Sequence, residues 1–527
     1  MNTCKIFTCV SSLLLLFFLT VWGGIGGAET LEINARDYPS FSHEEMGHLR
    51  WVIKLANQLP GDWSYMDKEI MGQGSMEWPK TDNKFRYQLA FMSYFLALAQ
   101  YHKTPAYREV YQQAMDKLIQ KMLRNEVWDY WYEVSKGGLK WNGQFSQEVG
   151  WIDPIVEKNV MYSGHLLHMI GLYKMLFRDM KYDEPGSITL TWDKVFPILK
   201  KKKFEYDHKS LAEVIYKQFV KNPLHVIECE PNAVFSACNQ HPVLGLMLYD
   251  HTHGTNLSAV KELVRKTFYD RGFIDPKTHN SMDFYMVRQN RLVPNSSSEF
   301  DRWTGWTGAF MHAWDPQLIE FHYAFQAEKH VKRYTDGTAT ASPMFAILAK
   351  EVGDDKTAEG ILAWFDKNFP SQWQDGMLCY LQKSDNKRWT PYAELMNKAV
   401  ALINVKNGLW TLHNRPWGDD HFVRPFINHV EYPKAIVKQS YYDPLKEALI
   451  VTLLAGTNDT GTTSFTVNNL DKSKRYSINK DGETLGNIEN GILHLKSEVK
   501  EIEWRADGTL AISTDLVKSH TFLIFAK

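Results

Sequence analysis

Residues 83–102 read "NKFRYQLAFMSYFLALAQYH", and apolar side chains recur there at every third or fourth position. Phe85, Leu89, Met92 and Leu96 would share one face of an α-helix, since 3.6 residues complete a helical turn. Ala99 continues the same face. This periodicity predicts a long helix that packs against other elements along an apolar side.

Similar patterns follow along the chain. Residues 105–123 repeat the spacing and open with Pro105, which we expect in the first turn of a helix. Loops rich in tryptophan, glycine and proline separate the predicted helices, and no fixed repeat is visible. The pattern favours a helical toroid, an α/α barrel with a pocket at one end, over a helical solenoid. The other predicted helices cover residues 159–177, 210–220, 256–268, 342–353 and 393–413.

The pattern changes near Pro416, Pro425 and Pro433, which interrupt helices. The segments that follow are short, rich in β-branched residues and often alternate between apolar and polar positions. Two Asp-Gly pairs, at residues 481–482 and 507–508, are typical of hairpin turns. We therefore expect a C-terminal all-β sandwich, residues 428–527, with an accessory role.

The first 28 residues resemble a secretory signal peptide, with one lysine before an apolar run and small residues near Ala28. Cleavage there would leave a mainly α catalytic domain, residues 29–427, with no later membrane span. The expected location is secreted or periplasmic, with an uncleaved signal anchor as the less favoured alternative. Export would permit glycosylation at the three sequons, Asn256, Asn295 and Asn458. The net charge of −1 argues against a nucleic-acid partner.

The chain has 5 cysteines, and Cys4 and Cys9 lie in the leader. Cys229 and Cys238 bracket the segment "CEPNAVFSAC", so three interpretations are open. Export makes a disulfide the plainest one. A metal site is less favoured, because no C-x-x-C pair is present, and we expect none. The third interpretation is a pair of thiols that act as acid and base.

Other candidate residues are embedded in apolar helices. His165 follows Gly164 amid large apolar residues, and a buried imidazole needs a hydrogen-bond partner, although such a histidine is usually structural. Tyr87 is a polar residue in an apolar helix, where it could equally send its hydroxyl to water. Trp303 and Trp306 crowd a loop-to-helix segment that could form core packing or the wall of a pocket.

Three segments together are similar to the linalool dehydratase/isomerase family. They are "VEKNVMYSGHLLHMIGLYKMLF", "NPLHVIECEPNAVFSACNQ" and "FRYQLAFMSYFLALA". The similarity extends over residues 44–413, and the combination of M-Y-x-G-H with C-E-P…F-x-x-C-N carries most of it. The family also has an Asp and a Tyr six residues apart. Here Asp62, Tyr65 and Asp67 have a different spacing, and the β domain is an addition to the family pattern.

The resemblance implies an (α/α)6 barrel and a lyase or isomerase without a cofactor, acting on a small isoprenoid alcohol or alkene. It also implies site residues: Tyr87, His165, Cys229 and Cys238 as catalytic groups, and Met161 and Phe235 as apolar substrate-binding groups. We add Trp303 and Trp306 as candidate substrate-binding residues, because aromatic side chains there could form a pocket wall. Neutral thiols, a phenol and an imidazole suit a dry pocket, where paired carboxylates are costly to desolvate. The resemblance shifts the preference for the cysteines from a disulfide to catalytic thiols.

Two other classes of function stay open. A helical toroid with a β-sandwich and many tryptophans also describes glycoside hydrolases and sugar lyases, which would use two opposed carboxylates in a wet groove. A secreted carrier of terpenoids or lipids would need only the apolar pocket. The sequence leaves the oligomeric state open, a homo-oligomer included. The candidate carboxylates for a glycosidase are Asp153, Glu157, Glu228, Glu230 and Asp301.

Overall fold

The computed structural model describes residues 33–66, 85–193, 201–295, 300–335, 342–379, 391–456, 461–497, 499 and 501–527. The predicted signal peptide, Asp67 and Asn458 lie outside the described residues. None of the described helices has the length and apolar character needed to cross a membrane.

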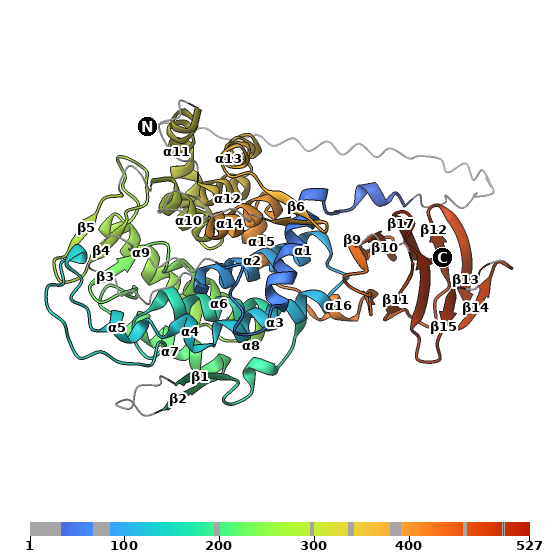
Figure 1. The fold of residues 1–527 in the computed structure, drawn as a ribbon, viewed down its shortest axis with the longest axis horizontal. Helices are drawn as coiled ribbons and strands as arrows, with labels where there is room; N and C mark the ends of the chain where they lie inside the picture. Colours follow the sequence, from blue (N-terminus) through green and yellow to red (C-terminus); the bar gives the residue numbers. More distant parts are fainter. Residues whose placement is uncertain are drawn as a thin grey trace, which may run out of the picture.

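Helices make up most of the structure up to residue 423, and strands dominate the remainder (Figure 1). This agrees with the predicted change from a mainly α part to a β-rich C-terminal part. The helices are α1 (His43–Asn57), α2 (Phe85–Lys103), α3 (Glu109–Met122), α4 (Asn125–Trp128), α5 (Trp131–Ser135), α6 (Val160–Phe177), α7 (His208–Lys221), α8 (Gln240–His253), α9 (Lys261–Arg271), α10 (Phe300–Met311), α11 (Pro316–Thr335), α12 (Pro343–Val352), α13 (Asp355–Asn368), α14 (Pro391–Ile403), α15 (Gly408–Asn414) and α16 (Asp419–Val423).

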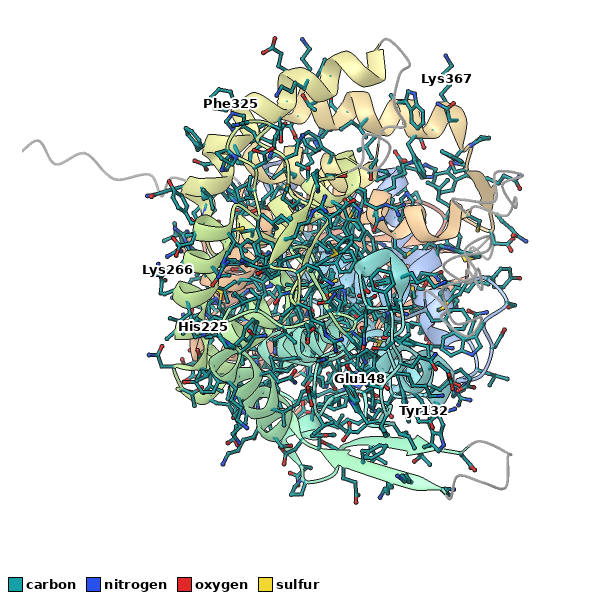
Figure 2. The ribbon with its side chains drawn as sticks, turned by 90° about the vertical axis from the view of Figure 1, so that its left-hand side faces the viewer. Tyr132, Glu148, His225, Lys266, Phe325 and Lys367 are labelled. Atoms are coloured by element: carbon teal, nitrogen blue, oxygen red, sulfur yellow. The ribbon has the colours of Figure 1, made fainter. Side chains whose placement is uncertain are left out.

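Six of these helices contact one another in a closed ring. The order of contacts is α2, α6, α8, α10, α12, α14 and back to α2. Outer helices pack on this ring: α3 contacts α2 and α6, α7 contacts α6 and α8, and α13 contacts α12. In the end view of Figure 2, Lys266, Phe325 and Lys367 of α9, α11 and α13 lie at the periphery.

The inner position of α6 follows from its sequence. All of its residues from Val160 to Met175 are buried, which leaves no polar face for water. A helix that is apolar on all sides belongs in the core. Two glycines of α6 let the neighbouring helix α8 approach closely. A Cβ atom at Gly164 would lie only 2.8 Å from Cδ of Pro242, and one at Gly171 only 2.9 Å from Cβ of Leu248, so larger side chains would not fit there.

Two predicted helices differ from the structure. α3 starts at Glu109, so Pro105 precedes the helix and the first-turn prediction is wrong. The reason is tertiary pairing: the Ala106 N–H donates to Ser440 O (3.1 Å), and its carbonyl accepts from the Ile427 N–H (2.8 Å). Residues 393–413 form two helices, because the buried Glu351 carboxylate accepts the backbone N–H groups of Leu409 and Trp410 and caps α15.

Small sheets accompany the helices. The hairpin β1 (Ile188–Trp192) and β2 (Lys202–Tyr206) lies beside α7, and β6 (Gln372–Gln374) pairs with β7 (Met377–Cys379) beside α1. A three-stranded sheet joins β3 (Ala233–Phe235), β4 (Phe284–Met286) and β5 (Arg291–Val293). It lies at the end of the helical part that is opposite the C-terminal strands (Figure 1).

The C-terminal strands form two antiparallel sheets. One has the order β14-β13-β12-β17-β10-β9 and the other β15-β16-β11-β8. Phe465 of β11 and Phe522 of β17 meet between them, with ring centroids 5.3 Å apart. Their bounds are β8 (Phe426–Asn428), β9 (Ala435–Asp443), β10 (Ala448–Ala455), β11 (Thr462–Asn468), β12 (Tyr476–Lys480), β13 (Glu483–Glu489), β14 (Ile492–Leu495), β15 (Ile502–Trp504), β16 (Leu510–Asp515) and β17 (His520–Ala526).

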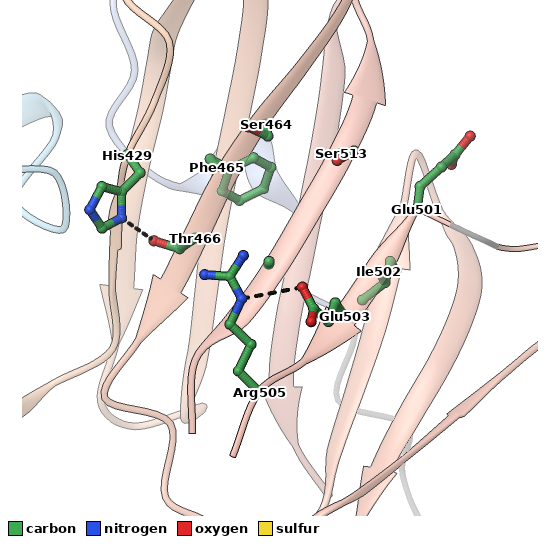
Figure 3. A pocket seen from close by; sticks show the side chains of 10 residues that line it. His429, Ser464, Phe465, Thr466, Glu501, Ile502, Glu503, Arg505 and Ser513 are labelled. Atoms are coloured by element: carbon green, nitrogen blue, oxygen red, sulfur yellow. Dashed lines mark hydrogen bonds and ion pairs between the residues drawn. The ribbon is translucent and has the colours of Figure 1, made fainter. Parts of the chain in front are cut away.

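A cavity of about 590 Å³ lies on the four-stranded sheet (Figure 3). Its polar side chains bond within the strands themselves: His429 lies 3.1 Å from the Thr466 hydroxyl, and Arg505 lies 3.2 Å from Glu503. No thiol lines it, and it lies far from the helical end that carries β3–β5 (Figure 1).

Candidate active site

Cys229 and Cys238 are buried free thiols. Burial raises the pKa of Cys229 well above its usual value, and the neighbouring Cys238 and the charge of Glu230 raise it further. The Phe235 backbone opposes part of this shift. The thiol of Cys229 therefore keeps its proton near neutral pH.

The segment between the two cysteines explains why they meet. Glu230, Pro231, Asn232 and Ala233 form a β-turn closed by the bond from Ala233 N–H to Glu230 O (2.9 Å). Proline at the second position and a residue with positive φ at the third are typical of a type II turn, and Asn232 has φ 71°. The turn returns the chain to β3, where the Ala233 carbonyl accepts the Cys229 N–H (2.9 Å).

Two asparagine side chains hold this loop in place. The Asn239 amide bonds to both backbone groups of Ile227 (2.8 and 3.0 Å) and to Phe235 O (3.0 Å). Asn232 donates to Asn142 O (2.6 Å), and its Oδ1 accepts the backbone N–H of Arg288 (2.7 Å). The spacing of the two sulfurs is thus fixed by a network of side-chain bonds.

The start of α6 lies against the cysteine loop. Val160 N–H donates to Glu228 O (3.4 Å), and the helix is entered through Asn159 in a left-handed conformation (φ 53°). The sulfur of Met161 accepts hydrogen bonds from the Tyr87 hydroxyl (3.4 Å) and the Arg86 guanidinium (3.5 Å). Tyr87 and Met161 are therefore neighbours. Arg86 is a buried cation beside them that the sequence analysis missed.

His165 is fully buried, and its ring meets that of Tyr87 edge-on at 5.6 Å. Its Nδ1 lies 2.7 Å from the Tyr94 hydroxyl, which is itself buried. Burial raises the pKa of Tyr94 well above its usual value, so the phenol keeps its proton. This hydroxyl has no other acceptor among the described residues, so we assign it as the donor to Nδ1. His165 must then carry its own proton on Nε2, a buried atom without a hydrogen-bond partner among the described residues.

The imidazole of His165 is neutral near pH 7. Burial and the nearby Arg86 lower its pKa from 6.5 to about 3. Its Nε2–H is thus a neutral donor with no acceptor, and a buried polar group of this kind calls for a partner. An oxygen atom of a bound molecule would satisfy it.

Behind His165 lies a chain of hydrogen bonds in which each proton has a defined place. Trp306 Nε1–H donates to Nε2 of His241 (2.7 Å), so His241 donates through Nδ1 to Nδ1 of His168 (3.2 Å). His168 then donates through Nε2 to His413 (2.7 Å), which donates through Nδ1 to Leu409 O (2.7 Å). Burial lowers the pKa of all three histidines, to about 4 for His413, so all three are neutral.

The tryptophans connect the histidine side to the cysteine side. Trp306 stands edge-on to Tyr87 (5.6 Å) and stacks on Trp303 (5.8 Å). Trp303 in turn packs against Phe235 (5.4 Å), between the two cysteines in sequence. These contacts join six of the eight predicted site residues, and Phe235 belongs to the segment that carries Cys229 and Cys238.

Two of the five carboxylates named for a glycosidase bind other side chains. Asp153 accepts the Tyr206 hydroxyl (2.6 Å), and Glu228 pairs with Lys158 (3.0 Å). Glu230 is buried beside the thiols, Glu157 is exposed, and the side chain of Asp301 lies outside the described part. Glu157 and Glu228 both line a cavity of about 560 Å³ beside α7, where Glu228 is neutralised by Lys158.

The polar residues before α2 are only partly described. Asp62 accepts the Ser64 N–H (2.9 Å) and the Gln58 amide (3.1 Å) in a turn after α1. Tyr65 packs edge-on against Trp51 (5.3 Å). Neither has a described contact with His165 or with the cysteine pair.

Residues 86–386 match the family model for linalool dehydratase/isomerase, which is more than half of the chain. Among solved structures, an alpha-amylase from Clostridium perfringens is 11% identical, with 69% of this chain and 99% of that chain covered and a TM-score of 0.40. A glucuronyl hydrolase specific for heparin is also 11% identical (71% and 97% covered, TM-score 0.41). The alpha-1,6-mannanase of Salegentibacter sp. HEL1_6 is 10% identical (71% and 100%, TM-score 0.37). Likenesses this weak carry no argument about function.

Proposed function

The chain belongs to the linalool dehydratase/isomerase family, and from this premise we propose that it is a cofactor-independent hydro-lyase or isomerase. It removes, adds or shifts water on a small isoprenoid alcohol. The observation that supports the proposal is the pair of buried free thiols in a segment whose Phe235 packs against Trp303, which connects it to Trp306, Tyr87 and the neutral His165.

Elimination of water needs an acid for the hydroxyl and a base for a neighbouring carbon. In the reactive form that we propose, the two sulfurs have lost one proton to solvent and share the one that remains. Cys229 gives this proton to the substrate hydroxyl, the C–O bond breaks, and water leaves. The sulfur of Cys238, as thiolate, takes a proton from the adjacent carbon, and a double bond forms. Return of this proton from Cys238 to Cys229 restores the reactive form.

His165 and the aromatic residues orient the substrate in this proposal. The unpartnered Nε2–H of His165 donates to the hydroxyl oxygen and binds the leaving water. The faces of Trp306 and Tyr87 stabilise positive charge on the allylic carbons, by ~0.5–2 kcal/mol for each cation–π contact. Met161 and Phe235 supply apolar contacts. In the reverse direction the same groups add water to an alkene. If the water returns to a different carbon, the alcohol is isomerised.

The ring of six inner helices supports an (α/α)6 barrel as the scaffold of this site. Tyr87 and His241 lie in the first turns of the inner helices α2 and α8, and His165 lies in the second turn of α6. This placement supports a pocket built by loops at one end of the proposed barrel. We further propose that the protein is exported, as the leader-like N-terminal sequence indicates.

The test is conversion of terpene alcohols and alkenes by the purified protein, followed by gas chromatography. Dehydration, hydration or isomerisation should occur without added metal or cofactor and should be lost in Cys229→Ser. Cys379→Ser is the matched control, since Cys379 is also a buried free thiol but has no contact with the pair. Hydrolysis of glycosides together with no turnover of any alcohol or alkene would contradict the proposal.

A further inference from the structure

A second cluster of polar side chains lies outside the candidate active site. Asp183, His208 at the start of α7 and His253 at the end of α8 bring one ligand atom each to within 4.8 Å of one another. Within the described ranges, no other three His, Cys, Asp or Glu residues do so. Since His241 and His253 are twelve residues apart on α8, this cluster is about 18 Å from the active-site histidines.

His253 is held with one nitrogen aimed at the cluster. Its Nδ1 lies 3.0 Å from Tyr249 O in the preceding helical turn, so Nδ1 donates its proton there. Its Nε2 faces Oδ1 of Asp183 at 3.0 Å. A histidine whose Nδ1–H is bound by a backbone carbonyl, with Nε2 facing a carboxylate oxygen, has the geometry of a metal ligand.

His208 gives the second, independent observation. Its side chain is fully buried, and neither ring nitrogen has a hydrogen-bond partner of acceptable geometry. Nδ1 points toward the same Oδ1 atom of Asp183, at 3.5 Å. An ion pair between His253 and Asp183 would leave His208 unsatisfied, and buried polar groups in native proteins are rarely left so.

We propose that Asp183, His208 and His253 bind a divalent ion of the zinc class through Oδ1 and one nitrogen of each imidazole. Two ligand atoms that are each ~2.0–2.1 Å from a tetrahedral zinc lie about 3.3 Å apart. The measured separations from Oδ1, 3.0 and 3.5 Å, bracket this value. Two imidazoles and one carboxylate are a common donor set for zinc, with water as the fourth ligand.

Lys174 adjoins the site and limits its affinity. Its ammonium donates to Oδ2 of Asp183, which leaves Oδ1 for the ion. A ligating carboxylate that accepts a hydrogen bond at its other oxygen is a usual arrangement. The positive charge nevertheless repels a second cation, so removing it should strengthen binding of the metal.

The site would link three separate parts of the helical domain. Asp183 lies between α6 and the β1–β2 hairpin, and the two histidines belong to the outer helix α7 and the inner helix α8. An ion held by all three would fasten the outer layer to the inner ring. Its role would therefore be structural, distinct from the proposed chemistry at Cys229 and Cys238.

The experiment is titration of the chelator-treated full-length protein with Zn²⁺ by calorimetry, with metal content measured by mass spectrometry. We expect one ion per chain and a rise in the thermal midpoint. His253→Gln, a partly exposed ligand whose loss should not prevent folding, should weaken binding at least tenfold and remove the rise in the midpoint. Lys174→Met should bind Zn²⁺ more tightly than the wild type.

Two controls separate this site from other sources of binding. His494→Gln, an exposed histidine on β14, should bind as the wild type does, and so should Cys238→Ser. Cobalt should give the visible bands of a tetrahedral nitrogen–oxygen site in the wild type and not in His253→Gln. The proposal is overturned if the wild type binds no stoichiometric ion, if His253→Gln binds with unchanged affinity, or if binding is lost in Cys238→Ser.

Discussion

The hydroxyl of Tyr94 lies 2.7 Å from Nδ1 of His165, and this contact determines on which nitrogen the imidazole carries its proton. The same phenol ring stacks on His241 at 5.3 Å, with the two planes 7° apart. Tyr94 therefore contacts both His165 and the chain of histidines that begins at His241. Its position on the inner helix α2 makes it a positioning residue.

Replacing Tyr94 by Phe should reduce turnover with little change in the fold. The variant removes the donor to Nδ1, so His165 can place its proton on either nitrogen and the Nε2–H donor is present only part of the time. A lost buried hydrogen bond corresponds to ~0.5–1.5 kcal/mol, so kcat should fall about three- to tenfold. Nitrogen NMR of labelled histidine reads the tautomer directly. An unchanged tautomer with unchanged kcat would contradict the assignment.

Replacing His241 by Phe should destabilise the protein and displace Trp306. The variant leaves the indole N–H of Trp306 without its acceptor and Nδ1 of His168 without its donor. Each buried group left unsatisfied costs ~1–3 kcal/mol. Urea unfolding measures the loss, and tryptophan fluorescence reports the indole environment. His251→Phe, at an exposed position of the same helix, removes one hydrogen bond to the His413 carbonyl and should cost less.

Periodicity predicted the helices well where burial alone decides the structure. Residues 83–102 gave α2 (Phe85–Lys103), because nearly every side chain there is buried. It failed where distant groups intervene, as at Pro105 and at the break between α14 and α15. Glu351, which caps α15, lies more than fifty residues before the helix it caps. No local pattern carries that information.

The candidate site residues were predicted through a resemblance to a family. The residues that this prediction missed depend on contacts between distant parts of the chain. The turn at Pro231 and Asn232 has a recognisable local signal, since proline followed by asparagine suits a type II turn. In contrast, Trp306 and His241 are 65 residues apart, and His168 and His413 are 245 apart. Their hydrogen bonds arise only when the inner helices close their ring.

Stability should fall as the pH is lowered from about 7 to about 5. Burial lowers the pKa of His165 to about 3 and that of His413 to about 4. As the pH falls, these two histidines are therefore protonated in the unfolded chain first, near their ordinary pKa of 6.5, and in the folded protein only at lower pH. Their contribution is complete above pH 6.5 and is lost below it, at about 1.4 kcal/mol per pH unit for each histidine. The pKa of His312 is raised by Glu351, and its opposite contribution is present below pH 6.5 and lost as the pH rises.

Urea unfolding at several pH values measures this dependence. The free energy of unfolding should decrease steeply below pH 6.5, and His413→Asn should make the decrease shallower by about one proton. A flat profile over the same range would show that the buried histidines are not held neutral by the fold.

The β part should prove tightly coupled to the helical part. Gln439 of β9 is buried, and its amide donates to the carbonyls of Ala35, Tyr38 and Pro39. Gln439→Ala should therefore cost ~1–3 kcal/mol, since these acceptors lose their donor. Asn487→Ala, on the far strand β13, is the control and should change the midpoint of unfolding little.

Removal of residues 434–527 should give a helical part of reduced stability, and complete loss of helical circular dichroism would show that the strands are required for its folding.

The last prediction concerns the two thiols. Cys229→Ser and Cys238→Ser keep the size of each side chain but replace the ionisable thiol, and general acid–base groups contribute ~10²–10⁴-fold to turnover. Each variant should lose activity on that scale while its unfolding midpoint stays near that of the wild type. A structural disulfide predicts the reverse pattern, a loss of ~2–4 kcal/mol of stability with activity largely kept.

Iodoacetamide offers a check without mutation: it should inactivate the enzyme by labelling Cys229 or Cys238, and bound substrate should protect against this inactivation. Cys379→Ser should be inactivated at the same rate as the wild type, because Cys379 is buried away from the pair and its pKa is raised to about 11. Peptide mapping that finds Cys229 linked to Cys238 in fully active protein would end the dithiol mechanism, and the chemistry would then have to rest on His165 and Tyr87.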